Sequence, residues 1–187
     1  MAGISNLIIL TTYYVLENHD ELANIDFKSI YSKLLLQNGG QPNNYLKVES
    51  INELASLHRN YPFFNSEVSI FSIDGGKKET SQWPIHIDAG RRSALNIPIL
   101  NCDIQSTTYF YSDPQPFRNK IETVPEYQIA IVHGKLDVID QFSLTKPTLI
   151  NTSIPHAVHN YGKGKRTILS WGSMLTLGEL KNELKSD

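Results

Sequence analysis

A histidine and an aspartate stand one residue apart in the segment His86-Ile87-Asp88, directly before a glycine turn. Side chains at positions i and i+2 of a β-strand lie on the same face, so this imidazole and this carboxylate can reach one point. They are two of the three ligands of a 2-His-1-carboxylate site, which leaves open positions on Fe(II). Because a His-x-Asp triplet also arises by chance, a surface histidine beside a turn aspartate is the alternative.

A second signal lies near the other end of the chain, where His156 begins one expected strand and Arg166 begins the next. An antiparallel return of the chain through the turn at Gly162 would bring Arg166 close to the site that His156 faces. A buried arginine without a carboxylate partner is costly, so it needs an anionic ligand or an internal acid. Its planar guanidinium suits the terminal carboxylate of a small diacid. The alternative is a surface arginine near Lys163 and Lys165.

The joint order and spacing of these residues resemble the iron(II)- and 2-oxoglutarate-dependent oxygenase superfamily. His86-x-Asp88 is followed after 68 residues by His156, and Arg166 comes ten residues later. The resemblance covers about residues 67 to 172, over half of the chain. It implies a double-stranded β-helix, which is a variant of the jelly roll.

Two segments resemble particular branches of that superfamily. The segments 155–158 and 166–171 are similar to the distal-histidine and arginine strands of prolyl-hydroxylase-like members. The step His156-x-x-x-Asn160 before the arginine resembles the aspartyl/asparaginyl β-hydroxylases. That type often lacks the metal carboxylate, so the presence of Asp88 places this chain nearer the common triad.

The resemblance implies a role for each matching residue. His86, Asp88 and His156 would bind Fe(II), and Arg166 would hold the distal carboxylate of 2-oxoglutarate. Family members pair that arginine with a hydroxyl or amide donor, and the sequence does not choose among the candidates Asn96, Ser170 and Tyr109. The implied reaction consumes O2 and 2-oxoglutarate, hydroxylates a C–H bond of a small molecule or peptide side chain, and releases succinate and CO2.

Two other functions account for parts of the same pattern. A cupin-type metal-dependent dioxygenase or isomerase would work without 2-oxoglutarate. Cupins resemble this chain in the His156-x-x-x-Asn160 element, but they normally carry His-x-His where this chain has His86-Ile87-Asp88. A non-catalytic jelly-roll binding module would bind no iron and would leave the position of Arg166 unexplained.

Three further residues lie close to these motifs. His159 is separated from His156 by three residues, and this odd spacing puts the two on opposite faces of a strand. Only one of them can point inward, and the spacing to the downstream arginine favours His156. Arg91 and Arg92 follow the His-x-Asp triplet, where they either form a solvated turn or steer an anionic substrate to the metal.

The elements that must position these residues form a β core with helices at both ends. Short β-type runs separated by turn sequences recur from Glu67 to about residue 174, which is typical of a sandwich or barrel, with a jelly roll as the leading choice. Strands are expected over 4–15, 68–73, 85–87, 94–100, 107–111, 127–132, 136–142, 148–151, 156–159 and 167–171.

Helical spacing of apolar residues appears outside this region. It predicts helices over 27–35, over 51–58 with Ser50 as the N-cap, and over 177–184 at the end of the chain. We therefore expect one domain, in which residues 1–66 form a brace of helices and a strand, 67–174 the jelly-roll core, and 175–187 a terminal helix.

Composition limits the partners of this domain. The chain has 187 residues and a net charge of -2, which provides no global electrostatic reason to bind nucleic acid or an anionic membrane. The single cysteine, Cys102, excludes an internal disulfide framework and is typical of a reducing compartment. The apolar run Leu7–Leu10 is too short to span a bilayer. We expect a cytoplasmic protein without nucleic-acid or membrane partners.

Overall fold

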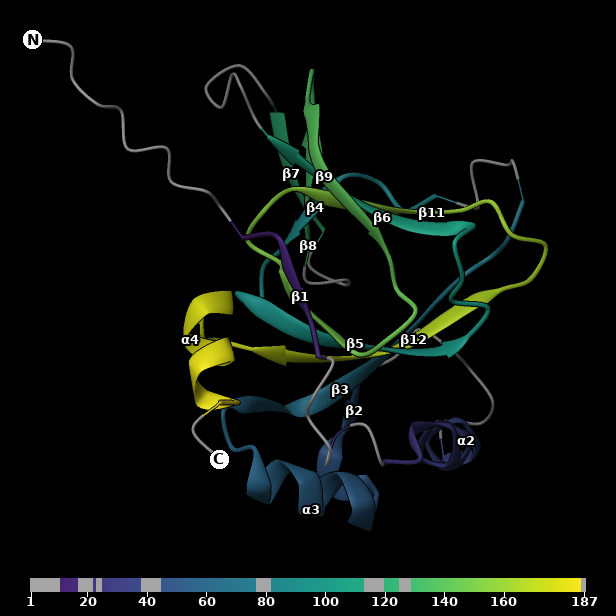
Figure 1. Cartoon of the computed structure of the whole chain (residues 1–187), viewed down its shortest axis with the longest axis vertical. Coiled ribbons are helices and arrows are strands. Elements are labelled where there is room, and N and C mark those ends of the chain that lie inside the picture. Colours follow the sequence, from purple (N-terminus) through teal and green to yellow (C-terminus); the bar gives the residue numbers. More distant parts are fainter. Residues whose placement is uncertain are drawn as a thin grey trace, which may run out of the picture.

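The chain folds into two antiparallel β-sheets that lie one above the other, with helices beneath the lower sheet (Figure 1). The structure is a computed structural model, and it describes residues 11–16, 22, 25–37, 45–76, 82–112, 120–124 and 129–185. This arrangement confirms the prediction of a mainly β protein with helices at the start and the end of the chain.

The sheet next to the helices, here called the helix-side sheet, has the strand order β1-β10-β5-β12-β3-β2. Every neighbouring pair in it is antiparallel. Its strands are β1 (Tyr13–Val15), β2 (Tyr45–Lys47), β3 (Phe64–Ile73), β5 (Ser93–Leu100), β10 (Thr148–Asn151) and β12 (Arg166–Ser173).

The opposite sheet, here called the metal-side sheet, has the strand order β7-β8-β4-β11-β6-β9, again with antiparallel neighbours. Its strands are β4 (His86–Asp88), β6 (Ser106–Ser112), β7 (Lys120–Val124), β8 (Ile129–His133), β9 (Asp137–Ser143) and β11 (His156–Asn160). The expected ligands His86, Asp88 and His156 thus lie on its two central strands.

The helices pack on the outer face of the helix-side sheet (Figure 1). They are α2 (Phe27–Gln37), α3 (Asn52–Asn60) and α4 (Leu177–Glu183), with a short 3-10 helix, η1 (Val48–Ser50), before α3. A capping box between Thr176 and Glu179 begins α4, which confirms the predicted terminal helix.

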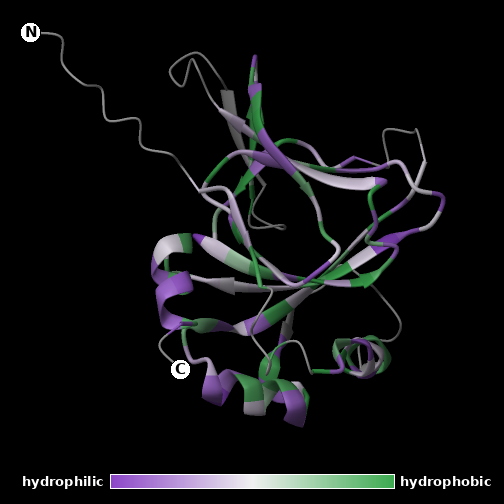
Figure 2. Cartoon of the chain, viewed as in Figure 1, coloured by the Kyte–Doolittle hydropathy of each residue, from purple (hydrophilic) through white to green (hydrophobic). Residues whose placement is uncertain are grey.

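Alternation along the helix-side strands divides the apolar core into two layers. On β12, Leu169 and Trp171 pack toward the helices, whereas Ile168 packs into the space between the sheets with Phe110 of β6. Figure 2 shows hydrophobic residues along the strands of both sheets and on the helices that cover one of them. Because the even-numbered positions of β12 face the inter-sheet space, Arg166 and Ser170 also point there.

Most predicted strands are present, with ends that differ by a few residues. The core begins at Phe64, earlier than the predicted residue 67, and the sequence missed the strands β2 and β7. Of the strand predicted over 4–15, residues 13–15 form β1 and residues 4–10 lie outside the described part. The predicted N-cap Ser50 is wrong: its hydroxyl donates to the carbonyl of Lys47 within η1, and Ile51 precedes α3 without a side-chain cap.

The turn at residues 161–165 connects the two sheets, because β11 and β12 belong to different sheets. Arg166 therefore reaches the site from the opposite layer of the sandwich. Asn160 connects the two layers, since its Nδ2 donates to the carbonyl of Ile73, the β3 partner of Arg166.

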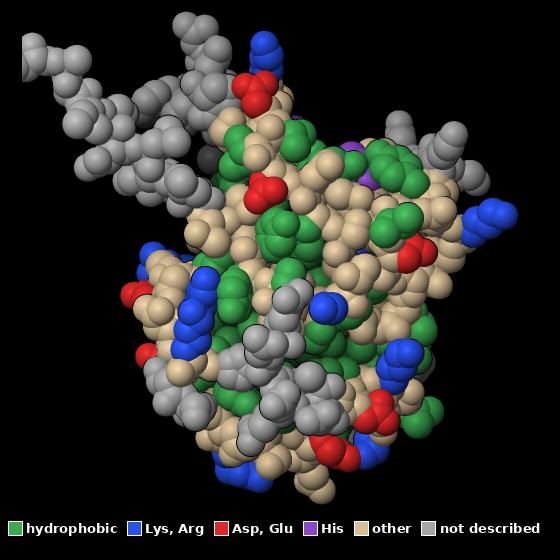
Figure 3. All heavy atoms as spheres, in the orientation of Figure 1, with side chains coloured by type: hydrophobic (Ala, Val, Ile, Leu, Met, Phe, Trp, Pro, Cys, Tyr) green, Lys and Arg blue, Asp and Glu red, His purple; other side chains and the backbone are tan. Residues whose placement is uncertain are grey.

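In the part of the chain that the structure describes, no helix combines the length and apolarity needed to cross a bilayer. On the face shown in Figure 3, the Lys and Arg side chains lie scattered among Asp and Glu. This mixture reflects the near balance of 17 basic and 19 acidic residues in the whole chain.

Candidate metal centre

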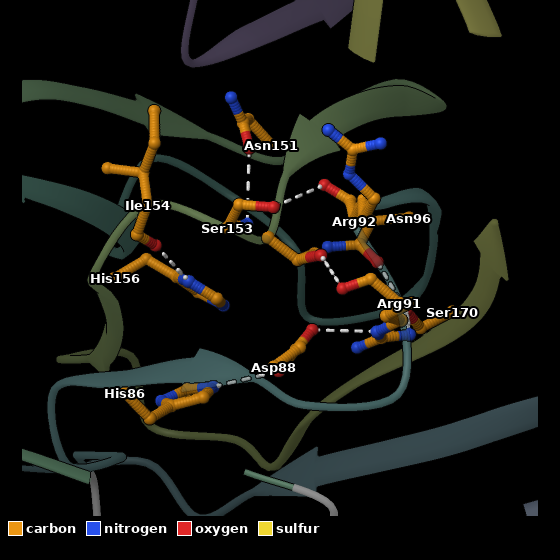
Figure 4. Close-up of polar contacts among 11 residues, drawn as sticks. His86, Asp88, Arg91, Arg92, Asn96, Asn151, Ser153, Ile154, His156 and Ser170 are labelled. Carbon is orange, nitrogen blue, oxygen red and sulfur yellow. Dashed lines mark hydrogen bonds and ion pairs between the residues drawn. The ribbon is translucent and has the colours of Figure 1, made fainter. Parts of the chain in front are cut away.

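His86, Asp88 and His156 converge between the sheets, and they are the group of described residues that could hold a metal ion (Figure 4). Their ligand atoms all lie within 4.8 Å of one another. His156 of β11 is paired in register with His86 of β4, and their ring centroids are 4.3 Å apart. All three side chains are buried. The structure thus brings together the three ligands expected from the sequence.

Backbone carbonyls fix the tautomers of both histidines. Nδ1 of His86 lies 2.7 Å from the carbonyl of Pro84, and Nδ1 of His156 lies 2.9 Å from the carbonyl of Ile154. A carbonyl oxygen can only accept, so each Nδ1 is the protonated nitrogen. Each Nε2 therefore keeps its lone pair for a metal, and this outer contact also fixes the ring orientation.

The two carboxylate oxygens of Asp88 have different neighbours. Oδ1 lies 3.6 Å from Nε2 of His86, and Oδ2 accepts a 2.6 Å hydrogen bond from Nε of Arg91. Burial favours the neutral acid, but Arg91 and the two histidines outweigh it and hold the pKa of Asp88 below its usual range. A charged carboxylate with one oxygen turned toward two imidazoles suits a divalent cation.

The environment of His86 keeps this imidazole neutral. Burial, together with the nearby His156, lowers its pKa from 6.5 to about 4, although Asp88 acts in the opposite direction. A neutral imidazole is the form that binds metal, so the metal-free site is ready for a ligand-metal bond near neutral pH.

This low pKa predicts a pH-dependent stability of the metal-free protein. Because the folded-state pKa of His86 lies below the unfolded value, its contribution is fully present above about pH 6.5 and is lost as the pH falls toward about 4. The free energy of unfolding is expected to fall by roughly 2 kcal/mol between pH 7 and pH 5 from this group. Urea unfolding with a chelator present measures it. His86→Gln should lose this part of the pH dependence of the free energy of unfolding. An unchanged pH dependence in the variant would contradict the low pKa assigned to His86.

Arg166 is a buried cation that pairs with no acid of the described residues. It is 3% exposed, its Nε has no hydrogen-bond partner, and no carboxylate of the described residues pairs with it. Burial lowers the pKa of its guanidinium, which shows how unfavourable this position is for a charge. Such a group either destabilises the protein with no compensating interaction or binds an anion.

Arg166 and the three candidate metal ligands line one cleft between the sheets. The remaining wall is mostly apolar and includes Phe71, Trp83, Ile129, Val158 and Ile168. Apolar walls exclude water, so charges inside the cleft interact more strongly than they would in solvent. The cleft thus combines a metal-binding end with a cationic wall.

Hydrogen bonds between two turns hold the ligand strands in place (Figure 4). The turn after β4 carries Arg91 and Arg92, whose carbonyls accept from the hydroxyl and the amide of Thr152, 3.1 and 3.2 Å away. In return, the amide of Asp88 donates to the carbonyl of Thr152. Thr152 lies just before β11, so its contacts connect the segment that carries Asp88 to the segment that carries His156.

Two candidates from the sequence lie outside the cleft. His159 occupies the outer face of β11, where its Nδ1 lies 2.9 Å from the hydroxyl of Tyr161 and its ring lies 4.9 Å from that of Tyr109. This confirms that His156, and not His159, points inward. Tyr109 shares the outer face, so it does not face Arg166.

The other two candidate partners for the 2-oxoglutarate carboxylate are buried between the sheets, but Ser170 contacts a different arginine, and Asn96 contacts Ser170. Ser170 accepts from Nη1 of Arg91 at 2.7 Å and donates to Oδ1 of Asn96 at 2.6 Å. The structure therefore groups Asn96 and Ser170 with Asp88 and Arg91. Ser170 lies four residues along β12 from Arg166.

Sequence analysis left the role of Arg91 open between a solvated turn and an entrance that steers anions. The structure places its side chain inside the protein, 13% exposed, against Asp88. The sequence signal that could have indicated this contact was the spacing of three residues between Asp88 and Arg91, across a glycine turn. Arg92, in contrast, is exposed, as expected for a turn residue.

The chain matches no protein-family model, and no curated protein matches it either.

Proposed function

We propose that this protein is an Fe(II)- and 2-oxoglutarate-dependent oxygenase that hydroxylates a C–H bond of its substrate. The observation that carries the proposal is the cleft that the His86, Asp88 and His156 cluster shares with the buried Arg166, whose Nε has no hydrogen-bond partner among the described residues. A metal site alone is compatible with many reactions. A metal site in one cleft with a buried cation calls for a ligand with a metal-binding end and a second, anionic end.

The strand order supports the jelly-roll form of the β-sandwich. The strands β3-β12-β5-β10 are consecutive in one sheet, and β4-β11-β6-β9 are consecutive in the other. Successive core strands mostly alternate between the sheets, as in a double-stranded β-helix. The strands β1, β2, β7 and β8 then extend the edges of this eight-strand core.

The donor set fits Fe(II). Two imidazoles and one carboxylate are the ligand set of the facial arrangement that non-haem Fe(II) oxygenases use, which leaves positions open for other ligands. The outer contacts of His86 with Pro84, of His156 with Ile154 and of Asp88 with Arg91 are of the kind that orients metal ligands.

The buried arginine fits the distal carboxylate of 2-oxoglutarate. The guanidinium matches a carboxylate geometrically, and the paired charges would remove the cost of an isolated buried cation. A cupin-type enzyme without a diacid co-substrate would carry that cost without compensation, and so would a non-catalytic module.

When bound, Fe(II) would activate O2 with electrons from 2-oxoglutarate, so that one oxygen atom enters the substrate C–H bond as a hydroxyl and the other enters succinate, with release of CO2. The protein would orient the metal and the co-substrate and would exclude water from the cleft. His86, Asp88 and His156 would fix the metal, Arg166 would fix the co-substrate, and the apolar wall with Phe71 would keep water away.

Turnover tests the proposal. Protein supplied with Fe(II), ascorbate, O2 and 2-oxoglutarate is expected to form succinate faster when fractions of small metabolites or peptides include the substrate. His159→Ala is the matched control, because this histidine lies on the same strand but on the outer face. If no fraction raises succinate formation above the level of His156→Ala, the oxygenase proposal fails.

A further inference from the structure

Arg91 is surrounded by residues of β3, β4 and β12 and of the turn before β11, and we call this surrounding its socket (Figure 4). Its Nε donates to Oδ2 of Asp88 at 2.6 Å, and its Nη1 donates to the hydroxyl of Ser170 at 2.7 Å. Ser170 in turn donates to Oδ1 of Asn96 at 2.6 Å. The guanidinium also lies over the ring of Phe71, 5.5 Å from its centroid.

The socket depends on a glycine. A Cβ atom at Gly172 would lie 2.7 Å from Cδ and 3.2 Å from Cβ of Arg91, which is closer than side-chain atoms pack. Gly172 thus provides the space in which the stem of Arg91 lies. The carbonyl of Arg91 accepts from the hydroxyl of Thr152 at 3.1 Å, so its backbone is held as well.

The consequence falls on the metal-facing carboxylate. With Oδ2 held by Arg91, the carboxylate plane of Asp88 is fixed, and only Oδ1 is turned toward Nε2 of His86. A free carboxylate could rotate and present both oxygens to a metal. A carboxylate held in this way presents one, which preserves an open coordination position.

We propose that Arg91 is the positioning residue of the metal centre, which restricts Asp88 to binding through Oδ1, with Ser170 and Asn96 holding Arg91 in place. The proposal rests on the metal centre of the proposed function. It also gives Ser170 and Asn96 a role that differs from the expected contact with 2-oxoglutarate. Arg91 itself acts only through Asp88.

Titration with Co²⁺ alone tests this without a substrate, because the visible absorption of bound Co²⁺ reports both affinity and coordination geometry. Arg91→Gln is expected to weaken Co²⁺ binding by about 10- to 100-fold, the usual effect of losing an outer partner of a metal ligand, and to alter the shape of the spectrum. Arg91→Lys keeps the charge but has one side-chain nitrogen in place of the two that donate to Asp88 and Ser170, so the Co²⁺ affinity of this variant should be intermediate. Arg92→Gln removes an equal charge from the same turn and should bind as the wild type does.

Ser170→Ala separates positioning from a general structural role. This residue contacts none of the three metal ligands, yet its loss should weaken Co²⁺ binding by a smaller factor, and it should have no further effect in the Arg91→Gln background. If Arg91→Gln does not fold, the Co²⁺ titration of Ser170→Ala tests the positioning role in its place.

Two outcomes overturn the proposal in distinguishable ways. If wild-type protein binds Co²⁺ and Arg91→Gln and Ser170→Ala match its affinity and spectrum, the positioning role is wrong and the proposed function stands. If wild-type protein binds no Co²⁺, the metal centre is wrong, and the positioning role falls with it.

Discussion

Arg166→Met is expected to weaken 2-oxoglutarate binding strongly and, at the same time, to stabilise the metal-free protein. Each hydrogen bond to a charged group contributes about 1.5–3 kcal/mol, so loss of a guanidinium that makes two of them should weaken binding by about 100-fold or more. Replacing a buried charge with an apolar side chain of similar volume is often neutral or stabilising by about 1–4 kcal/mol. Among the residues that the structure describes, no acid pairs with this buried guanidinium.

The two effects are measured separately. Calorimetric titration of the metal-loaded protein with 2-oxoglutarate gives the affinity, and urea unfolding of the metal-free protein gives the free energy of unfolding. Arg92→Met, an exposed position in a turn, is the matched control for both. Unchanged affinity in Arg166→Met would show that the anion site is elsewhere, and a marked loss of stability would show that Arg166 is compensated within the protein.

His156→Ala is expected to remove metal binding, whereas His159→Ala leaves it unchanged. The two histidines lie three residues apart on β11, but His156 belongs to the cluster, whereas the ring of His159 lies tilted against that of Tyr109 on the outer face. Loss of an outer partner already costs about 10- to 100-fold in affinity, so loss of a ligand should exceed 100-fold.

Equilibrium dialysis against Fe(II) or Co²⁺ measures this difference, with circular dichroism to confirm that both variants keep their β structure. The reverse result, in which His159→Ala loses the metal and His156→Ala retains it, would invert the assignment of the inner face of β11.

The sequence predicted those parts of the fold and site that depend on local periodicity. Alternation placed His86 and Asp88 on one face of a strand and separated His156 from His159, and the structure agrees in both cases. The strand β10 has the predicted bounds, because its apolar residues stand between clear turn signals. These inferences need only the two-residue period of a strand.

Features that depend on which sheet a strand joins could not be predicted in this way. The turn after Asn160 was expected to return the chain toward the site, but periodicity could not show that β11 and β12 lie in opposite sheets, so that Arg166 approaches the cleft from across the sandwich. The strands β2 and β7, which were missed, each lie at the edge of a sheet.

Side chains that meet through tertiary packing were beyond the sequence for the same reason. Asn96 and Ser170 were candidates for contact with Arg166, but Ser170 contacts Arg91 and Asn96 contacts Ser170, because the register of β5 against β12 pairs these two residues beside Arg91. Gly172 drew no attention in the sequence, although the absence of its side chain is what admits Arg91.

The most direct test of the account is an anaerobic titration of the Fe(II)-loaded protein with 2-oxoglutarate, followed by visible absorption. If the three ligands and Arg166 form one site, a weak metal-to-ligand charge-transfer band appears and saturates. It should be missing in His156→Ala and should require far more 2-oxoglutarate in Arg166→Met. If Fe(II) binds and 2-oxoglutarate leaves the spectrum unchanged, the protein is a metal protein of another kind, and the oxygenase account is contradicted.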